Sequence, residues 1–260
     1  MKKLIVAIDG PSGAGKSTAS KMLAKRLGFL LINTGLLYRG VAYLVKLFKS
    51  NDKEAAKLAN IHGIFFDLCG NDLLYKGRTI TQEVIDDQMS MIASTLSKDP
   101  EVREEVNIIA RDIARKSECG IVTEGRDTCT VLFPDADIKI YMTAELNFRA
   151  NMRYVQLKNS GVEADYEEVR RSIMQRDEQD MNRAVAPLTR DPDAILIDTS
   201  HMQLDFVVSW LYTLVEVIRG KPAKVTLGSP VSEDTASLRV IANKLGSLDE
   251  RLSLLEDKLK

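Results

Sequence analysis

The residues near the amino terminus carry the most specific chemical signal in this sequence. An apolar run ending at Ile8 leads directly into Gly10-Pro11-Ser12-Gly13-Ala14-Gly15-Lys16-Ser17, which matches G-x-x-x-x-G-K-[ST] in full. Glycines let backbone N–H groups turn inward around an anion, and a helix amino terminus adds partial positive charge. The motif therefore predicts a nucleotide-phosphate site over Gly10 to Thr18, with Lys16 reaching the phosphates and Ser17 ligating Mg²⁺.

Arginines in the predicted loops supply a second signal. A phosphate acceptor needs no general base, because its oxygens are largely ionised at neutral pH. The main barrier is the repulsion between two polyanions, and guanidinium groups together with a metal ion relieve it. The candidates for such a clamp are Arg39, Arg126, Arg176 and Arg183.

The apolar pattern predicts the elements that position these residues. Short apolar runs with β-branched members predict buried parallel strands, and helically spaced apolar residues predict the helices between them. The predicted strands are 4–8, 30–32, 121–123, 138–142 and 194–197, and the predicted helices are 17–27, 36–48, 100–116, 146–159, 166–181 and 204–218. This alternation predicts an α/β fold, a parallel sheet covered by helices on both faces, with ligands beyond the carboxyl ends of the strands.

One segment departs from this alternation inside the predicted domain. Ile64–Phe66 and Leu73–Tyr75 are short apolar runs on either side of a turn at residues 70–72. Such a pair predicts a small antiparallel excursion within residues 62–80.

A second departure follows residue 220. Prolines and a glycine at Pro222, Gly228 and Pro230 predict a linker over 221–235. Residues 236–260 then repeat leucine or isoleucine at heptad a and d spacing, which predicts a coiled-coil-like helix that forms a homo-oligomer. Docking of that helix on the body of its own chain is the alternative.

Composition narrows the class of protein. The 260 residues are 45% apolar, and 36 basic against 37 acidic side chains leave a formal charge of −1. That balance argues against broad binding of nucleic acid or of an anionic membrane surface. Three cysteines without CxxC spacing and two histidines give no zinc or disulfide pattern. With no apolar run long enough for a membrane span, we expect a cytoplasmic protein.

Five collinear segments of this sequence resemble bacterial cytidylate kinase, a nucleoside monophosphate kinase. They are Asp9–Thr18, Asn33–Arg39, Glu124–Asp127 with Val131–Asp137, Arg176–Asp180 and Asn182–Leu188. The resemblance covers residues 1 to about 218. It implies a P-loop NTPase-type domain over 1–220, with an acceptor-binding insertion at about 34–100 and a helical lid at about 176–192. It further implies transfer of a phosphoryl group from ATP, with Mg²⁺, to CMP or dCMP.

The same resemblance assigns roles to individual residues. Thr34, Ser94, Arg103 and Asp127 would contact the acceptor and its cytosine. Arg39, Arg126 and Arg176 would bind the acceptor phosphate, Asp180 the ribose, and Arg183 the transferring phosphoryl group, so Lys16, Arg126, Arg176 and Arg183 are the expected catalytic residues. As alternatives, Asp127 is a structural partner of Arg126, and Ser94 and Arg103 are ordinary helix-surface residues.

Several positions depart from the family pattern. Asn33 and Glu124 stand where the family usually has Asp, and Cys129 stands where Gly is usual, so a turn that needs positive φ is reshaped. Gln179 and Met181 replace basic residues of the lid. These departures predict weaker charge neutralisation. They keep two alternatives open: another P-loop kinase acting on UMP, AMP or shikimate, and a nucleotide-binding scaffold without activity.

Overall fold

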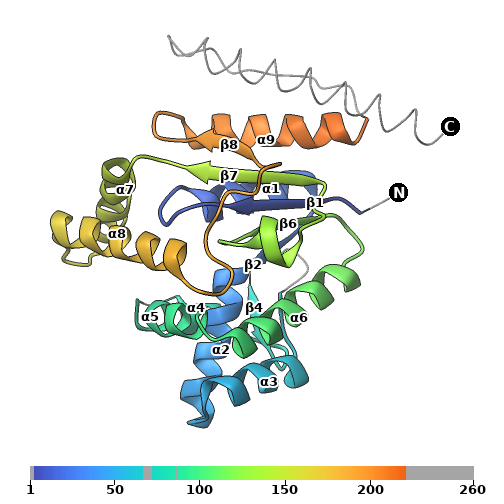
Figure 1. Ribbon diagram of the computed structural model, residues 1–260, viewed down its shortest axis with the longest axis vertical. Helices are drawn as coiled ribbons and strands as arrows, with labels where there is room; N and C mark the ends of the chain where they lie inside the picture. Colours follow the sequence, from blue (N-terminus) through green and yellow to red (C-terminus); the bar gives the residue numbers. More distant parts are fainter. Residues whose placement is uncertain (1–2, 67–71, 86, 221–260) are drawn as a thin grey trace. The chain divides into compact units, whose positions relative to one another are not determined.

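A five-stranded parallel sheet lies at the centre of the computed structural model, which describes residues 3–66, 72–85 and 87–220. Its strands are β1 (Ile5–Asp9), β2 (Leu30–Asn33), β6 (Ile121–Glu124), β7 (Ile138–Thr143) and β8 (Ile195–Asp198). They are ordered β2-β6-β1-β7-β8, and every neighbouring pair is parallel (Figure 1). The predicted α/β fold is therefore confirmed, and each strand lies within one residue of its predicted bounds.

Strand β1 lies in the middle of this sheet and fixes where a ligand can bind. The chain leaves β1 for β2 on one side and later leaves β6 for β7 on the other side. Connections that diverge in this way open a crevice beyond the carboxyl ends of the strands. Val6, Ala7 and Ile8 have no exposed surface, as expected for a strand covered on both faces. The glycine-rich loop that follows β1 therefore lies at the mouth of the crevice.

Helices flank the sheet in the predicted order. Helix α1 (Lys16–Leu27) packs beside α9 (Leu204–Ile218), and α6 (Pro100–Lys116) packs against β2. Helix α6 begins where the sequence predicts because Asp99 caps it, accepting the N–H of Glu101 at 2.8 Å, and a proline occupies its first turn. Helices α7 (Leu146–Asn159) and α8 (Tyr166–Asn182) pack on each other and extend from the sheet at the left of Figure 1.

The insertion after β2 combines helices with a second sheet. It contains α2 (Thr34–Phe48), α3 (Asp52–His62), α4 (Thr81–Val84) and α5 (Asp87–Leu96), and the strands β3 (Ile64–Phe66), β4 (Leu73–Tyr75) and β5 (Arg78–Thr79). Strands β3 and β4 are antiparallel, which confirms the predicted excursion, and β5 adds a third strand. The turn predicted at residues 70–72 falls largely outside the described residues.

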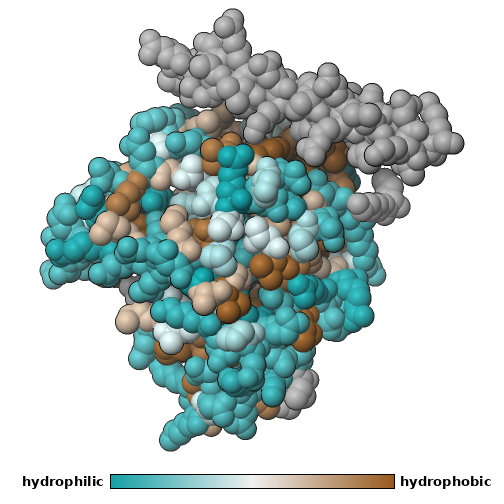
Figure 2. Space-filling view, viewed as in Figure 1, coloured by the Kyte–Doolittle hydropathy of each residue, from teal (hydrophilic) through white to brown (hydrophobic). Residues whose placement is uncertain are grey.

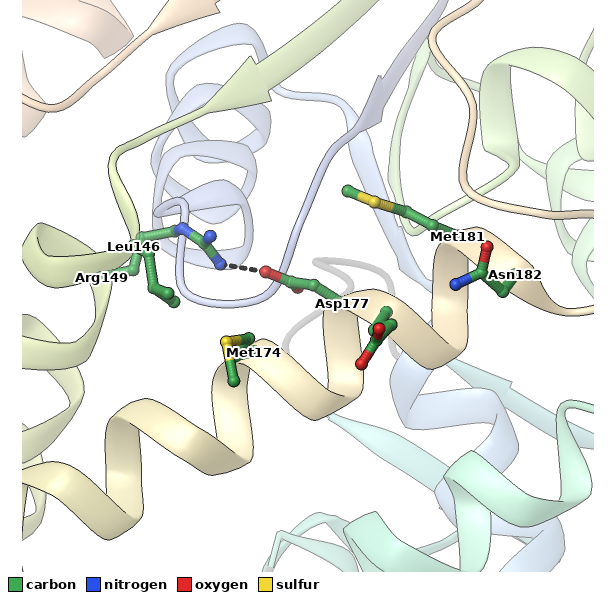
Figure 3. Close-up of a pocket in the computed structure, with 7 residues that line it drawn as sticks. Leu146, Arg149, Met174, Asp177, Met181 and Asn182 are labelled. Carbon is green, nitrogen blue, oxygen red and sulfur yellow. Dashed lines mark hydrogen bonds and ion pairs between the residues drawn. The ribbon is translucent and has the colours of Figure 1, made fainter.

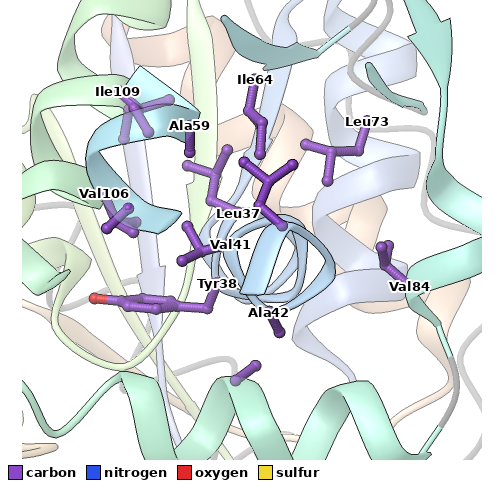
Figure 4. Close-up of a cluster of buried hydrophobic side chains, with 14 of the residues drawn as sticks. Leu37, Tyr38, Val41, Ala42, Ala59, Ile64, Leu73, Val84, Val106 and Ile109 are labelled. Atoms are coloured by element: carbon purple, nitrogen blue, oxygen red, sulfur yellow. The ribbon is translucent and has the colours of Figure 1, made fainter. Parts of the chain in front are cut away.

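Buried side chains of α2 hold this insertion together. Leu37 and Val41 lie in a cluster with Ile64 from β3 and with Val106 and Ile109 from α6 (Figure 4). The sequence did not predict α3, because its buried face consists of alanines, which give a weak apolar stripe: Ala55, Ala56 and Ala59. The cluster makes the insertion and α6 a single packed support for the acceptor side of the crevice.

The predicted lid at 176–192 has two structural parts. Its first residues form the last turns of α8, which ends at Asn182. The following residues continue without regular structure to β8, and Ala186 has a φ of 50°. The backbone remains tied to α8 because the N–H of Leu188 donates to the carbonyl of Asp180 at 2.8 Å.

The described residues belong to one compact unit of the chain. The linker and heptad helix predicted at 221–260 lie outside them. Within the described ranges, no helix is both long and apolar enough to cross a membrane. Figure 2 shows polar residues over most of one face, with apolar residues in small separate groups.

Candidate nucleotide-binding site

The loop between β1 and α1 has a backbone that only glycine permits at two of its turns. Gly10 has a φ of 146°, and a Cβ there would lie 1.8 Å from the carbonyl oxygen of Met142. Gly15 has a φ of 83° and caps α1. Both positions require glycine because an L side chain is strained at positive φ. The loop therefore closes tightly over the amino terminus of α1, where backbone N–H groups favour an anion.

Lys16 is enclosed by this loop. Its side chain is 4% exposed, and Nζ donates to the carbonyl oxygen of Pro11 at 2.6 Å. Burial, and to a smaller extent repulsion from the nearby Arg126 guanidinium, lower the pKa of Lys16 to about 7. An anion in the loop would favour the charged form of the lysine. Phosphate binding would therefore shift Lys16 toward its protonated, positively charged form.

Ser17 and Glu124 form the candidate magnesium site. The hydroxyl of Ser17 donates to Glu124 Oε1 at 2.8 Å, and Glu124 is 5% exposed at the end of β6. Mg²⁺ is usually held by one or two protein oxygens together with the phosphates of the nucleotide. A hydroxyl beside a buried carboxylate fits that requirement. No group of three or more potential metal ligands occurs in the part of the chain that the structure describes.

Asn33, one of the positions that departs from the family pattern, has a structural task in this fold. Its Oδ1 accepts the N–H of Leu36 at 3.0 Å and so caps α2. It also pairs in register with Glu124 across the two strands. Asn33 therefore lies next to the candidate metal site while its side-chain oxygen caps α2.

The four arginines predicted as a clamp do gather at this edge of the sheet. Nε of Arg126 donates to Asp180 Oδ2 at 2.8 Å. The pKa of Arg176 is lowered by burial and then by the charges of Arg126 and Arg39, which shows that these three guanidinium groups interact. Nη1 of Arg183 lies 3.8 Å from Asp180 Oδ1. Arg126 and Arg183 therefore meet at Asp180, with Arg176 and Arg39 near enough for their charges to act on one another.

Arg183 also contacts Ala186, in the segment that follows α8, and Asp127. Its Nε donates to the carbonyl of Ala186 at 2.6 Å, and its Nη2 lies 3.1 Å from Asp127 Oδ1. Burial lowers the pKa of Arg183, and the neighbouring Arg103 guanidinium lowers it further. The guanidinium of Arg183 is thus held in the site by a backbone carbonyl and by the carboxylate of Asp127.

Asp127 is shared between two arginines, and neither of them is Arg126. Its second oxygen forms a buried ion pair with Arg103 of α6. The alternative that made Asp127 a partner of Arg126 is therefore wrong, because Arg126 turns toward Asp180. The alternative that placed Arg103 on a helix surface is also wrong, because its side chain is only 4% exposed.

The other predicted acceptor residues lie around this pair at different depths. The hydroxyl of Thr34 donates to the carbonyl of Glu124 at 3.0 Å. Ser94 is half-buried on α5, and its carbonyl accepts the hydroxyl of Ser97 at 2.8 Å. The carbonyl of Ser97 in turn accepts Nη1 of Arg103 at 2.9 Å. The structure therefore links Ser94 to the Arg103 region through Ser97.

The backbone at Cys129 differs from the prediction of a turn that needs positive φ. The positive φ values of described non-glycine residues occur at Lys49, Lys76 and Ala186, so Cys129 does not occupy a position that needs glycine. It lies instead in η1 (Thr128–Leu132), a turn of π-helix, with its side chain 1% exposed. Cysteine is accommodated because a helical backbone suits any L residue.

Asp9 is a buried residue to which the sequence analysis assigned no role. It ends β1 immediately before the glycine-rich loop and is 1% exposed. Its carboxylate accepts the N–H and hydroxyl of Thr128 at 2.9 and 2.8 Å and the N–H of Cys129 at 2.7 Å. Burial raises its pKa. Asp9 thus ties the phosphate loop to the segment that carries Arg126, and its position just before the motif was the available signal.

A hollow beside the phosphate loop is lined in part by Met181, one of the lid positions that departs from the family pattern. It has a volume of about 340 Å³ and is lined by Leu146, Arg149, Met174, Asp177, Glu178, Met181 and Asn182 (Figure 3). Met181 is 47% exposed, and Gln179 is also exposed. The sequence analysis did not single out Arg149 or Asp177, whose buried ion pair lies next to the loop.

A parallel sheet with β1 at its centre and a complete phosphate-binding loop define the P-loop class of nucleotide-binding proteins, and partly buried arginines lie at the same edge of the sheet. The sequence profile of one family, described as cytidylate kinase, matches residues 6–217. The cytidylate kinase of Caldicellulosiruptor saccharolyticus is 40% identical over 225 residues, which cover 85% of this chain and 99% of that protein.

Two further relatives agree. The cytidylate kinase of Fervidobacterium nodosum is 38% identical over 211 residues, covering 81% of this chain and 95% of that protein. The cytidylate kinase of Mycoplasmopsis synoviae is 39% identical over 216 residues, covering 82% of this chain and 99% of that protein. The chain belongs to the cytidylate kinase family.

Proposed function

We propose that this protein transfers the terminal phosphoryl group of ATP to CMP or dCMP, giving ADP and the nucleoside diphosphate. The observation that carries the proposal is the meeting of Lys16 in the phosphate loop with Arg126 and Arg176. These cations are close enough to depress the pKa of the lysine. Cations gathered around a phosphate loop suit a polyanion, even though Glu124 and Asp180 offset part of their charge. The names of the relatives support cytidylate as the acceptor.

The chain's own residues supply charge and alignment. Lys16 and the loop N–H groups hold the β- and γ-phosphates of ATP, while Arg39, Arg126 and Arg176 hold the acceptor phosphate. Arg183 turns from Asp127 toward the phosphoryl group as it moves between the two nucleotides. Asp180 accepts a hydrogen bond from a ribose hydroxyl through the lone pairs that its contacts with Arg126 and Arg183 do not use. No proton need be removed, because the attacking phosphate oxygen is already ionised.

Magnesium is proposed as the cofactor, held by Ser17 and by the phosphates of ATP. When bound, it neutralises charge on the β- and γ-phosphates. Glu124 orients the Ser17 hydroxyl through the 2.8 Å hydrogen bond.

Base recognition is assigned to the acceptor side of the crevice. Arg103 and Asp127 offer donors and an acceptor within one buried ion pair, and Thr34 and Ser94 add short polar groups nearby. Cytosine presents both an amino donor and ring acceptors, so a paired guanidinium and carboxylate match its edge.

A panel of acceptors tests the proposal. ADP release is measured with CMP, dCMP, UMP, AMP and shikimate at equal concentration. We expect CMP or dCMP to give the largest kcat/KM. A preference for UMP, AMP or shikimate would favour a different P-loop kinase, and ATP binding without any transfer would favour the scaffold alternative.

Self-association remains a separate proposal from the heptad pattern of residues 236–260. Deletion of 221–260 should convert an oligomer to a monomer in light scattering while phosphoryl transfer persists. An unchanged mass would contradict it.

A further inference from the structure

Both backbone groups of Ser12, in the middle of the phosphate loop, are held by one buried ion pair from outside the loop. Asp177 Oδ1 accepts the N–H of Ser12 at 2.8 Å, and Arg149 Nη1 donates to its carbonyl oxygen at 2.7 Å. The same Nη1 atom is paired with Asp177 Oδ2 (Figure 3). Each of the two charged side chains is 9% exposed. The loop residue is thus fixed by α7, which carries Arg149, and by α8, which carries Asp177.

Arg149 is itself immobilised. Its Nε donates to the carbonyl of Ala144 at 2.8 Å, so the guanidinium binds three different oxygens at once. A Cβ placed on Gly13 would lie 3.2 Å from the Arg149 Cβ, which shows how closely the loop backbone approaches this side chain. A planar guanidinium suits this arrangement, whereas a lysine ammonium would be a flexible point charge.

The position of Asp177 on α8 connects this anchor to the acceptor side. Asp177 and Asp180 are three residues apart, so they lie on the same face of the helix. The first carboxylate holds Ser12, and the second accepts Nε of Arg126 at 2.8 Å. One helical turn therefore sets the spacing between the donor loop and an acceptor arginine.

We propose that Arg149 and Asp177 are a positioning pair that holds the donor-phosphate loop in register with the acceptor arginines. The inference rests on the proposed function, because it assigns the two sides of the site to donor and acceptor. A buried ion pair alone is weak support for stability, since its desolvation cost offsets much of its attraction. What this pair adds is two fixed bonds to a loop whose alignment decides the transfer.

The test uses Asp177→Asn and Arg149→Met in the full-length protein, alone and combined. Misplacing reacting groups by about 1 Å can cost on the order of a hundredfold in rate, so we expect kcat with CMP to fall between about tenfold and a hundredfold. Affinity for a non-hydrolysable ATP analogue, measured without acceptor, should fall as well, while the KM for CMP changes less than about threefold. The kcat and the analogue affinity of the double variant should be little lower than those of either single variant, because both substitutions disrupt the same ion pair.

Glu167→Gln on the same helix is the matched control, since it removes a carboxylate from an exposed pair with Arg170. It should leave analogue affinity and kcat unchanged. Unchanged analogue affinity and kcat in Asp177→Asn would overturn the inference. An equal loss of affinity for the ATP analogue and for CMP, in proportion to a lowered melting temperature, would also overturn the inference. Because analogue binding needs no acceptor, a parent protein that phosphorylates nothing would defeat the proposed function without deciding this result.

Discussion

Nη2 of Arg183 lies 3.1 Å from Oδ1 of Asp127, so the arginine of the lid segment is docked on the carboxylate that also binds Arg103. This contact joins residues from α6, from the segment after β6 and from the lid. It places the Arg183 guanidinium beside the acceptor region and not out in solvent. Transfer then requires the guanidinium to shift only within the site.

Replacing Arg183 with alanine should damage turnover far more than ATP binding. A single well-placed arginine is worth about 10³ to 10⁵ in rate in GTPases, and Arg183 is the arginine proposed to turn toward the phosphoryl group. We expect kcat for CMP to fall by about a hundredfold or more, with ATP affinity within about threefold of the parent. Arg171→Ala, an exposed arginine of α8, is the control. A loss under tenfold would count against the assigned role of Arg183.

ATP binding should take up a proton above neutral pH because of Lys16. The pKa of this lysine is about 7, so the side chain is mostly neutral at pH 8. Phosphates bind the cation, and binding therefore draws about one proton at pH 8 and progressively less below pH 7. Affinity should accordingly weaken as pH rises above about 7.

Calorimetry of a non-hydrolysable ATP analogue in two buffers with different ionisation enthalpies measures this proton. Lys16→Met should abolish this proton uptake. Equal heats in both buffers with the parent protein would show that the lysine is already charged.

Removal of magnesium with a chelator should abolish turnover, and Glu124→Gln should raise the Mg²⁺ concentration needed for half-maximal activity. Partners that orient a metal ligand typically change metal affinity by about 10- to 100-fold when mutated, and Glu124 orients the Ser17 hydroxyl. Activity titrated with Mg²⁺ at fixed ATP gives the value. Glu118→Gln, at an exposed position before β6, is the control. An unchanged titration curve for Glu124→Gln would remove this residue from the metal site.

Substitutions at Cys129 separate packing from backbone conformation. The side chain is 1% exposed and lies in a π-helical turn, so Cys129→Ala should cost about 1 kcal/mol of unfolding free energy. Cys129→Gly should cost about 0.5–1 kcal/mol more, because glycine loses more chain entropy on folding. Chemical denaturation measures both. A glycine variant more stable than the parent would show that the turn does prefer positive φ.

The sequence alone determined the α/β fold and the phosphate loop, and it predicted four arginines that lie at the same edge of the sheet. These features depend on local pattern: apolar runs form β1 and β7, helical spacing forms α6, and the loop motif is contiguous. The helix α3 was missed because alanine faces such as Ala55 and Ala59 give little periodic contrast.

Only the tertiary structure decided which charges pair. Arg126 binds Asp180, which is 54 positions away, and Arg103 binds Asp127, 24 positions away. It also showed that Arg149 and Asp177 hold Ser12, far away in the chain. A sequence records where charged residues stand, but burial and distance set which carboxylate neutralises which guanidinium. Those quantities exist only once the sheet has brought distant segments to a common edge.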